Sequence, residues 1–158
     1  MSEEQHKKNG EKVQEVTSRL TLTWLKDLAF TVNFDIPTMP SFKVDEAPPQ
    51  GSGNGVNASR LLGAAVGNCL SSSLAFCLNR SKIELKKMKT EVEIKNVRNE
   101  KGRLRVNHIK VDLYPELKSD EDSSKSKRCQ EIFEDYCIVT ESVRKGIPVD
   151  VNIKLAKQ

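Results

Sequence analysis

"GAAVGNCLSSSLAFCL", from Gly63 to Leu78, consists almost entirely of small and apolar residues and carries two of the chain's four cysteines. A helical pattern extends around it from Arg60 to Arg80, and Asn57 is placed to cap its start. The helix is apolar or small nearly all round, which predicts burial on most of its faces. Such a helix in a small domain needs cover, and this favours a partner subunit.

The segments before this helix predict an antiparallel meander. Apolar residues alternate up to Trp24 and again over residues 28–36, with a turn at Lys26 and Asp27. The stretch "SFKVD" over residues 41–45 predicts a short third strand.

The segments after the helix predict a hairpin and two shorter helices. Long alternating strands over residues 83–97 and 102–117 flank the turn "RNEKG". Helical patterns follow over residues 119–136 and 137–146, and "IPVDVNIKL" over residues 147–155 predicts a closing strand. The fold class is therefore α+β, with an N-terminal β-meander, a long buried central helix, a second antiparallel sheet and two shorter helices.

Composition indicates one globular domain over residues 11–158, after a disordered tail over residues 1–10. The 26 basic and 22 acidic residues are interspersed and only 5% of residues are aromatic, so we expect no nucleic-acid partner. The first fifteen residues lack the apolar core of a secretory signal. The apolar stretch Leu61–Leu78 is interrupted by polar residues, so we expect a core helix, no membrane contact and a cytoplasmic protein. In that compartment the cysteines are expected to be thiols rather than structural disulfides.

Two cysteines are candidates for chemistry. Cys69 lies in the middle of the central helix, where burial raises the pKa of a thiol and a thiolate needs a cation from another segment. Cys137 precedes a short helix that begins near Ile138, whose dipole favours a negative sulfur. The residues alone leave open whether each is a nucleophile or a buried core cysteine, and whether the two meet.

Other motifs carry weaker signals. Cys77 follows Cys69 by eight residues, about 12 Å on a helix and too far for a disulfide between them, and Cys129 stands in the same relation to Cys137. Without a C-x-x-C motif or a neighbouring histidine, we expect no metal site. The stretch "GSGNG" over residues 51–55 lacks the lysine of a phosphate-binding loop and predicts a flexible crossover.

Together these segments resemble the OsmC/Ohr family of thiol-dependent hydroperoxide reductases. The first family motif is matched in the central helix, and the second falls on Cys137 within "DYCIVTESVRKGIPVDVNI". The residues that match the first motif are Asn57, Leu61, Leu62, Ala64, Ala65 and Cys69. The resemblance implies an intertwined homodimer with active sites at the subunit interface.

The resemblance also implies an activity. Cys69 would be the peroxidatic cysteine that attacks an organic or hydrogen peroxide, and Cys137 would resolve the sulfenic acid as a disulfide. A dithiol donor, either a lipoyl protein or a thioredoxin-like protein, would then reduce this disulfide, and no cofactor is expected.

Two positions depart from the family pattern. The arginine that holds the thiolate in catalytic members falls near Lys26, and the glutamate that orients it falls on Ser59. Lys26 or Arg60 is therefore the candidate cation. The alternative function is a non-catalytic dimer that senses redox state or binds a small molecule. A cation within reach of Cys69 would favour catalysis, and an apolar wall would favour binding.

Overall fold

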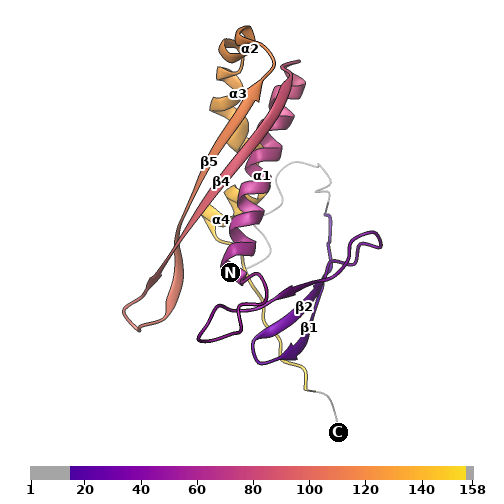
Figure 1. The fold of residues 1–158 in the computed structure, drawn as a ribbon, viewed down its shortest axis with the longest axis vertical. Helices are drawn as coiled ribbons and strands as arrows, with labels where there is room; N and C mark the ends of the chain where they lie inside the picture. The colour runs from indigo at the N-terminus through magenta and orange to yellow at the C-terminus, as the bar shows by residue number, and fades with distance from the viewer. Residues whose placement is uncertain (1–14, 156–158) are drawn as a thin grey trace, which may run out of the picture. The chain divides into compact units, whose positions relative to one another are not determined.

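The computed structural model describes residues 15–155, so the tail predicted over residues 1–10 lies outside them. The fold is α+β, as predicted, with antiparallel sheets and a long central helix (Figure 1). The chain divides into two compact units between Val56 and Asn57. The prediction of a single domain over residues 11–158 stays a prediction.

The N-terminal unit contains the predicted meander. Strands β1 (Thr21–Lys26), β2 (Ala29–Asn33) and β3 (Phe42–Val44) form an antiparallel sheet in the order β1-β2-β3. The turn falls where it was predicted, and Asp27 adopts a positive φ of 49°, a conformation that aspartate tolerates better than most residues. Strand β1 is exposed along its whole length.

The glycine-rich loop of this unit is organised around the buried carboxylate of Asp45. Its oxygens accept hydrogen bonds from the Ser52 hydroxyl at 2.6 Å and from the backbone amides of Glu46, Ser52 and Asn54 at 2.9 to 3.3 Å. The Ser52 hydrogen bond, helped by the amides, outweighs burial and holds the pKa of Asp45 below its ordinary value. A Cβ at Gly51 would lie 2.5 Å from the Asp45 carboxylate. The loop therefore encloses its own carboxylate, which differs from the flexible crossover predicted from its composition.

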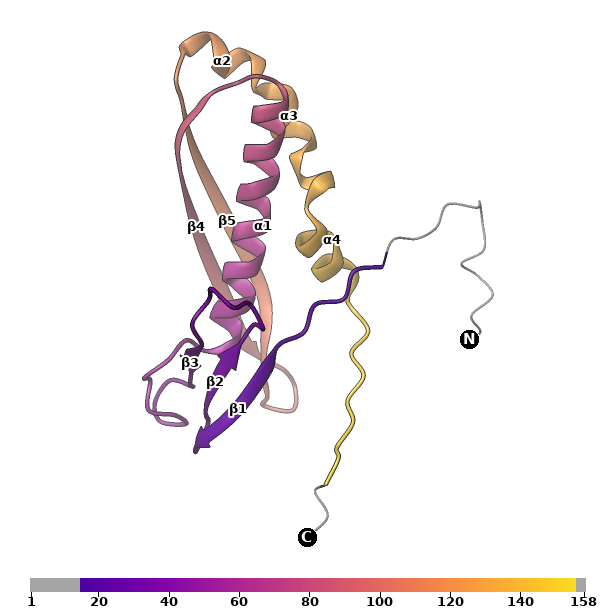
Figure 2. The same cartoon turned by 90° about the vertical axis from the view of Figure 1, so that its right-hand side faces the viewer.

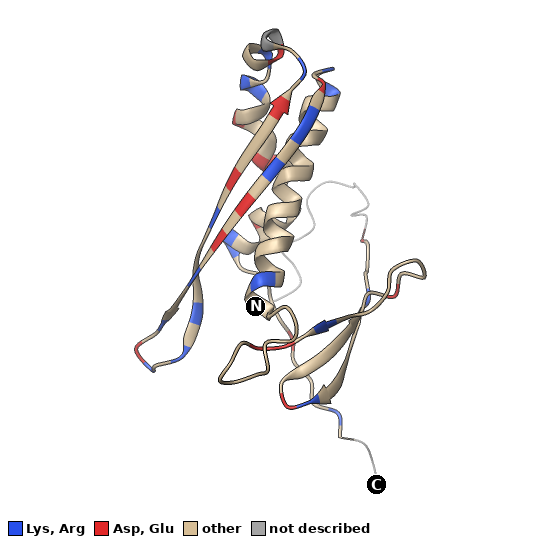
Figure 3. Cartoon of the chain, in the orientation of Figure 1, with Lys and Arg blue, Asp and Glu red and all other residues tan. Residues whose placement is uncertain are grey.

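The second unit is built on α1 (Ala58–Arg80), whose start is capped by the predicted Asn57. The Asn57 side chain accepts a hydrogen bond from the Arg60 amide at 3.1 Å. The antiparallel strands β4 (Leu85–Arg98) and β5 (Leu104–Leu117) form the predicted hairpin, which lies along α1 (Figures 1 and 2). Acidic and basic residues mark the hairpin, whereas α1 is uncharged between its ends (Figure 3).

Two glycines let α1 approach the hairpin closely. A Cβ at Gly63 would lie 2.4 Å from the Cδ1 atom of Ile94, and a Cβ at Gly67 would lie 2.7 Å from a methyl of Val92. The glycine side of α1 therefore packs directly on β4. Fewer faces of α1 are buried than predicted. A stripe of the helix stays exposed in the single chain, comprising Ala64, Ala65, Asn68, Ser72 and Phe76.

The other side of α1 is covered by the C-terminal helical segment (Figure 2). This segment consists of α2 (Asp120–Lys125), α3 (Lys127–Ile132), a 3₁₀ turn η2 (Phe133–Tyr136) and α4 (Ile138–Lys145). The first of the two predicted helices is thus broken into three short pieces. The second ends at Gly146 as predicted, with a positive φ of 76°.

The predicted closing strand over residues 147–155 is not formed in the single chain. The segment has no assigned secondary structure, and its alternating apolar side chains are exposed, with Val149 at 79%, Val151 at 80% and Ile153 at 87%. A strand needs a neighbour to satisfy its backbone hydrogen bonds, and none of the described strands lies in register with this segment.

The expectation that all four cysteines are thiols is wrong for one pair. A disulfide joins Cys77, near the end of α1, to Cys129 in α3, with the two Cα atoms 5.6 Å apart. Both cysteines are buried in a cluster with Leu74, Leu78 and Ile83. The eight-residue spacing excludes a bond between Cys77 and Cys69 on one helix. It carries no information about pairing between α1 and α3, which lie far apart in the sequence.

Helix α1 is long and apolar enough to cross a membrane by length and composition alone. In the structure it lies between the hairpin and the C-terminal helices, with buried residues along its length, such as Val66, Leu70, Leu74 and Leu78. Its apolar character is therefore accounted for by the core of this unit.

Replacing Gly63 tests this close approach. We expect Gly63→Val to lower the free energy of unfolding by about 1–3 kcal/mol, because the added methyl groups overpack the contact with Ile94. The measurement is urea unfolding followed by circular dichroism. The control is Ala58→Val at the exposed start of the same helix, which should change stability much less. Equal stability of the two variants would contradict the packing described.

Candidate functional site

The structure brings the two sequence-predicted cysteines together. Cys69 in the middle of α1 and Cys137 at the start of α4 are both free thiols, and a hydrogen bond joins their sulfurs. Cys137 is only 1% exposed, whereas Cys69 is partly exposed. They lie in one apolar cluster with Val66 and Leu70. Contact between α1 and α4 thus creates a dithiol from residues far apart in the sequence.

Local structure fixes the Cys137 sulfur. Cys137 is the N-cap residue of α4, and its Sγ accepts a hydrogen bond from the Thr140 amide at 3.4 Å. A second hydrogen bond joins Sγ to the Thr140 hydroxyl oxygen at 2.9 Å. Sulfur here takes the role that serine or aspartate oxygen usually plays at a helix start. The prediction that a helix begins near Ile138 and that Cys137 sits at its N-terminus is confirmed.

The same helix start also serves Cys69. The backbone amides of Ile138 and Val139 donate hydrogen bonds to the Cys69 sulfur. These amides lack partners inside α4 because they belong to its first turn. Cys69 gains no such help from its own helix, as predicted. The N-terminus of α4 supplies donors to both sulfurs.

The two thiols have opposite pKa shifts. Burial, followed by the neighbouring Cys137 sulfur, raises the pKa of Cys69 above its ordinary value. Burial also acts to raise the pKa of Cys137, but hydrogen bonds from Cys69 and Thr140 outweigh it, so the pKa of Cys137 is lowered. Because the sulfurs are in contact, the first ionisation belongs to the pair.

The other predicted site residues lie at the start of α1 and at the end of β1. Arg60 is exposed in the first turn of α1, nine residues before Cys69 and so about 13 Å away along the helix axis. The Ser59 hydroxyl donates to the Asn57 side-chain oxygen at 3.2 Å, which strengthens the N-cap at the position of the family glutamate. Lys26 is the last residue of β1 in the N-terminal unit and is exposed.

Sequence reasoning missed Thr140 and the amides of Ile138 and Val139. The available signal was the spacing of Cys137 and Thr140, since a capping side chain and a residue three positions later commonly exchange hydrogen bonds. Among residues 15–155, no cluster of histidine, cysteine, aspartate and glutamate side chains has the grouping needed to hold a metal ion.

A cavity of 600 Å³ with both apolar and polar lining reaches Thr140, which contacts the dithiol. Leu62 and Val66 from α1, Val111 from β5, and Thr140 and Val143 from α4 line it. Thr140 thus contacts the cavity and the Cys137 sulfur together.

Charged and polar side chains also line this cavity. Arg144 and Glu134 both line it and pair at 2.6 Å, and Arg144 also pairs with Glu141 at 3.0 Å. The guanidinium is therefore neutralised by carboxylates, and His108 and Asn107 add further polar lining.

Comparison with known proteins identifies the family. The profile of the OsmC-like protein family matches residues 51–152, which include both cysteines of the dithiol. The chain therefore belongs to the OsmC-like family, and the predicted resemblance is confirmed. No curated protein sequence matches the chain.

Solved structures share its fold at low sequence identity. An OsmC-like protein of unknown function from Vibrio cholerae has a TM-score of 0.66 at 13% identity, covering 81% of this chain and 94% of its own. An organic hydroperoxide resistance protein from Legionella pneumophila gives 0.57 at 15% identity, covering 82% and 90%. That of Bacillus subtilis gives 0.56 at 19% identity, covering 82% and 91%. These likenesses extend the fold assignment over most of the chain.

Replacing the Thr140 hydroxyl tests the electrostatics of the dithiol. We expect Thr140→Val to move thiolate formation to higher pH, because a hydrogen bond that lowers the pKa of Cys137 is lost. The measurement is the ultraviolet absorbance of thiolate as a function of pH. Thr140→Ser keeps the hydroxyl and should titrate close to wild type. A valine variant that titrates like wild type would contradict the assigned cause.

Proposed function

We propose that this chain is a cysteine-based hydroperoxide reductase that acts on organic or hydrogen peroxides, with Cys69 peroxidatic and Cys137 resolving. The observation that carries the proposal is the contact between two free thiols at the start of α4 in a chain of the OsmC-like family. Structures named for organic hydroperoxide resistance share this fold.

The assignment of the two roles rests on access. Cys69 is partly exposed, whereas Cys137 is buried, so a peroxide from solvent reaches the Cys69 sulfur first. The two sulfurs ionise as one pair. Cys69 attacks in the state in which it carries the negative charge and Cys137 carries the remaining proton.

The proposed reaction consists of peroxide attack, disulfide formation and reduction by a dithiol donor. The Cys69 thiolate attacks the terminal peroxide oxygen and the O–O bond breaks. The leaving alkoxide or hydroxide takes the Cys137 proton to give an alcohol or water, and Cys137 becomes a thiolate. Cys69 is then a sulfenic acid. The Cys137 thiolate attacks its sulfur and releases hydroxide, which is protonated to water, and a disulfide forms. A dithiol donor, of the lipoyl or thioredoxin-like kind, reduces this disulfide and is itself oxidised.

Amide donors replace the usual arginine in this scheme. The amides of Ile138 and Val139 hydrogen-bond to the Cys69 sulfur and lower its pKa, although burial has the larger effect. A helix start stabilises a thiolate without a guanidinium. Lys26 remains a candidate cation from the N-terminal unit, and Arg60 is the weaker candidate because of its distance along α1.

The neighbouring cavity favours an organic peroxide over hydrogen peroxide. Its lining by Leu62, Val66 and Val111 suits an apolar substituent, which would gain affinity from burial. The same cavity supports the second candidate function, a non-catalytic dimer that binds a small apolar molecule or senses redox state through the dithiol.

Two exposed apolar segments favour a homodimer. Residues 147–155 alternate apolar and polar side chains without a strand partner, and β1 exposes Leu22 at 52% and Trp24 at 63% at the edge of its sheet. A second copy can cover both kinds of surface.

We also predict that the protein is cytoplasmic, because dithiol donors are present in that compartment.

Charge placed in this segment tests the dimer. We expect Val151→Lys combined with Ile153→Lys to convert a dimer into a monomer, because the charges cannot be buried against a partner. The measurement is light scattering coupled to size-exclusion chromatography. Lys154→Ala, in the same segment, is the matched control and should stay dimeric. A monomeric wild type would overturn this part of the proposal.

Peroxide consumption by cysteine variants tests the reaction. The reduced protein is mixed with cumene hydroperoxide, and the remaining peroxide and free thiols are measured over time. We expect wild type to lose two thiols per peroxide, Cys69→Ser to consume none, and Cys137→Ser to stop at the sulfenic acid. Consumption by Cys69→Ser but not by Cys137→Ser would reverse the roles. Slow oxidation indifferent to both substitutions would favour the binding or sensing function.

A further inference from the structure

Two cysteine pairs bridge the same two segments of the chain. Cys69 and Cys77 lie eight residues apart on α1, and Cys137 and Cys129 lie eight residues apart on the segment from α3 to α4. Cys69 contacts Cys137, and Cys77 is bonded to Cys129. The two segments therefore run antiparallel, and the pairs are about 12 Å apart along α1. The dithiol and the disulfide therefore both lie at the contact between α1 and the segment from α3 to α4.

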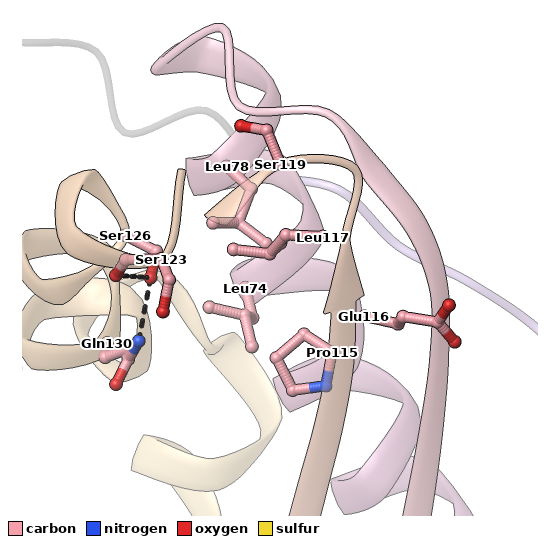
Figure 4. A pocket seen from close by; sticks show the side chains of 9 residues that line it. All are labelled: Leu74, Leu78, Pro115, Glu116, Leu117, Ser119, Ser123, Ser126 and Gln130. Atoms are coloured by element: carbon pink, nitrogen blue, oxygen red, sulfur yellow. Dashed lines mark hydrogen bonds between the residues drawn. The ribbon is translucent and has the colours of Figure 1, made fainter. Parts of the chain in front are cut away.

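A cavity interrupts the contact between α3 and α1. A cavity of 330 Å³ lies between Leu74 and Leu78 of α1 and the side chains of Ser126 and Gln130 (Figure 4). Those polar groups bond within their own segment, since Gln130 donates to the Ser126 hydroxyl and that hydroxyl donates to the Ser123 carbonyl, each at 2.8 Å.

A second hollow flanks the disulfide. This cavity of 820 Å³ is lined by Phe76 and Arg80 of α1, by Arg128 of α3 and by Tyr136 of η2, together with both bonded cysteines. Cavities therefore lie on both sides of this contact. The covalent bond and the small cluster around it are the main attachment of α3 to α1.

We propose that the Cys77–Cys129 disulfide is a positioning bond, which holds the α3–α4 segment on α1 and thereby favours formation of the Cys69–Cys137 disulfide. The inference rests on the proposed function only in taking Cys69 and Cys137 as a reactive pair. Cys77 and Cys129 do not exchange directly with that pair, because about 12 Å of helix separates them and a disulfide requires its Cα atoms within roughly 7 Å. Their effect is mechanical: an α3 tied to α1 leaves the Cys137 sulfur less freedom to move away from Cys69.

The coupling must be reciprocal. If the outer disulfide favours the inner one by some factor, then the inner disulfide must favour the outer one by the same factor. Formation of either bond from two thiols transfers two electrons to an oxidant and releases two protons. Oxidised dithiothreitol serves as that oxidant in a test and becomes the reduced dithiol.

The experiment is a redox titration without peroxide. Wild type and the Cys77→Ala/Cys129→Ala double variant are equilibrated in mixtures of oxidised and reduced dithiothreitol too oxidising to open the outer disulfide of wild type. Free thiols are then alkylated and the Cys69–Cys137 state is read by peptide mass spectrometry. We expect the equilibrium constant for this disulfide to be roughly tenfold lower in the double variant, within the range typical of coupled sites.

A control and a second arm make the result decisive. Ser81→Ala removes the hydroxyl that lies 3.4 Å from the Cys129 sulfur but keeps the disulfide, and should titrate like wild type. In the second arm, Cys77→Ser/Cys129→Ser removes the outer disulfide but keeps a polar atom at each position, and should lower the Cys69–Cys137 equilibrium constant by the same factor. This arm decides the matter if the first double variant fails to fold. Equal constants in wild type and variant, in whichever arm folds, overturn the proposal.

A kinetic readout separates this inference from the proposed function. After peroxide treatment, the Cys77→Ala/Cys129→Ala variant should accumulate more sulfinic acid at Cys69, because slower resolution leaves the sulfenic acid exposed to further peroxide. Absence of any oxidation at Cys69 in wild type would sink the peroxidase proposal while leaving the titration result intact. Equal sulfinic acid in both proteins would count against the positioning role alone.

Discussion

The first turn of α4 is the feature on which the site depends. Its unpaired amides face two sulfurs from different parts of the chain, and a helix start is among the few groups that stabilise a buried negative charge without a side-chain cation. Hydrogen bonds to a charged group contribute about 1.5–3 kcal/mol each, which is enough to offset part of the desolvation of a thiolate. These amides and the Thr140 hydroxyl act to lower the pKa of the two thiols, against burial, which acts to raise both.

Helix α1 makes this arrangement possible because its two sides differ. Gly63 and Gly67 remove side chains from the side that meets β4, so the hairpin packs directly on the helix backbone. Cys69 and Cys77 project toward the C-terminal segment, where one contacts Cys137 and the other is bonded to Cys129. One helix thus fixes the hairpin on one side and both cysteine pairs on the other. The Cys77–Cys129 disulfide was outside any expectation drawn from family motifs.

Local signals predicted most of the elements, and they failed where a partner lay far away in the sequence or where no described strand pairs with the predicted one. The Asn57 cap, the turn at Asp27 and the start of α4 after Cys137 are each specified by neighbouring residues. The Cys77–Cys129 bond joins residues separated by 52 positions, and no local pattern encodes such a pairing. The strand pattern over residues 147–155 was read correctly as alternating, but a strand forms only beside another strand. For the same reason, neighbouring residues predict the helix start at Cys137 but carry no signal that Cys69 also contacts it.

The central claim is that Cys69 and Cys137 form one redox pair, and disulfide mapping tests it most directly. The reduced dithiol would be treated with one equivalent of an organic hydroperoxide, quenched by alkylation, digested and analysed by mass spectrometry. The account predicts a new peptide pair linked through Cys69 and Cys137, with the Cys77–Cys129 link unchanged. Sulfinic acid at Cys69 beside an alkylated Cys137, or no change at either residue, would contradict it.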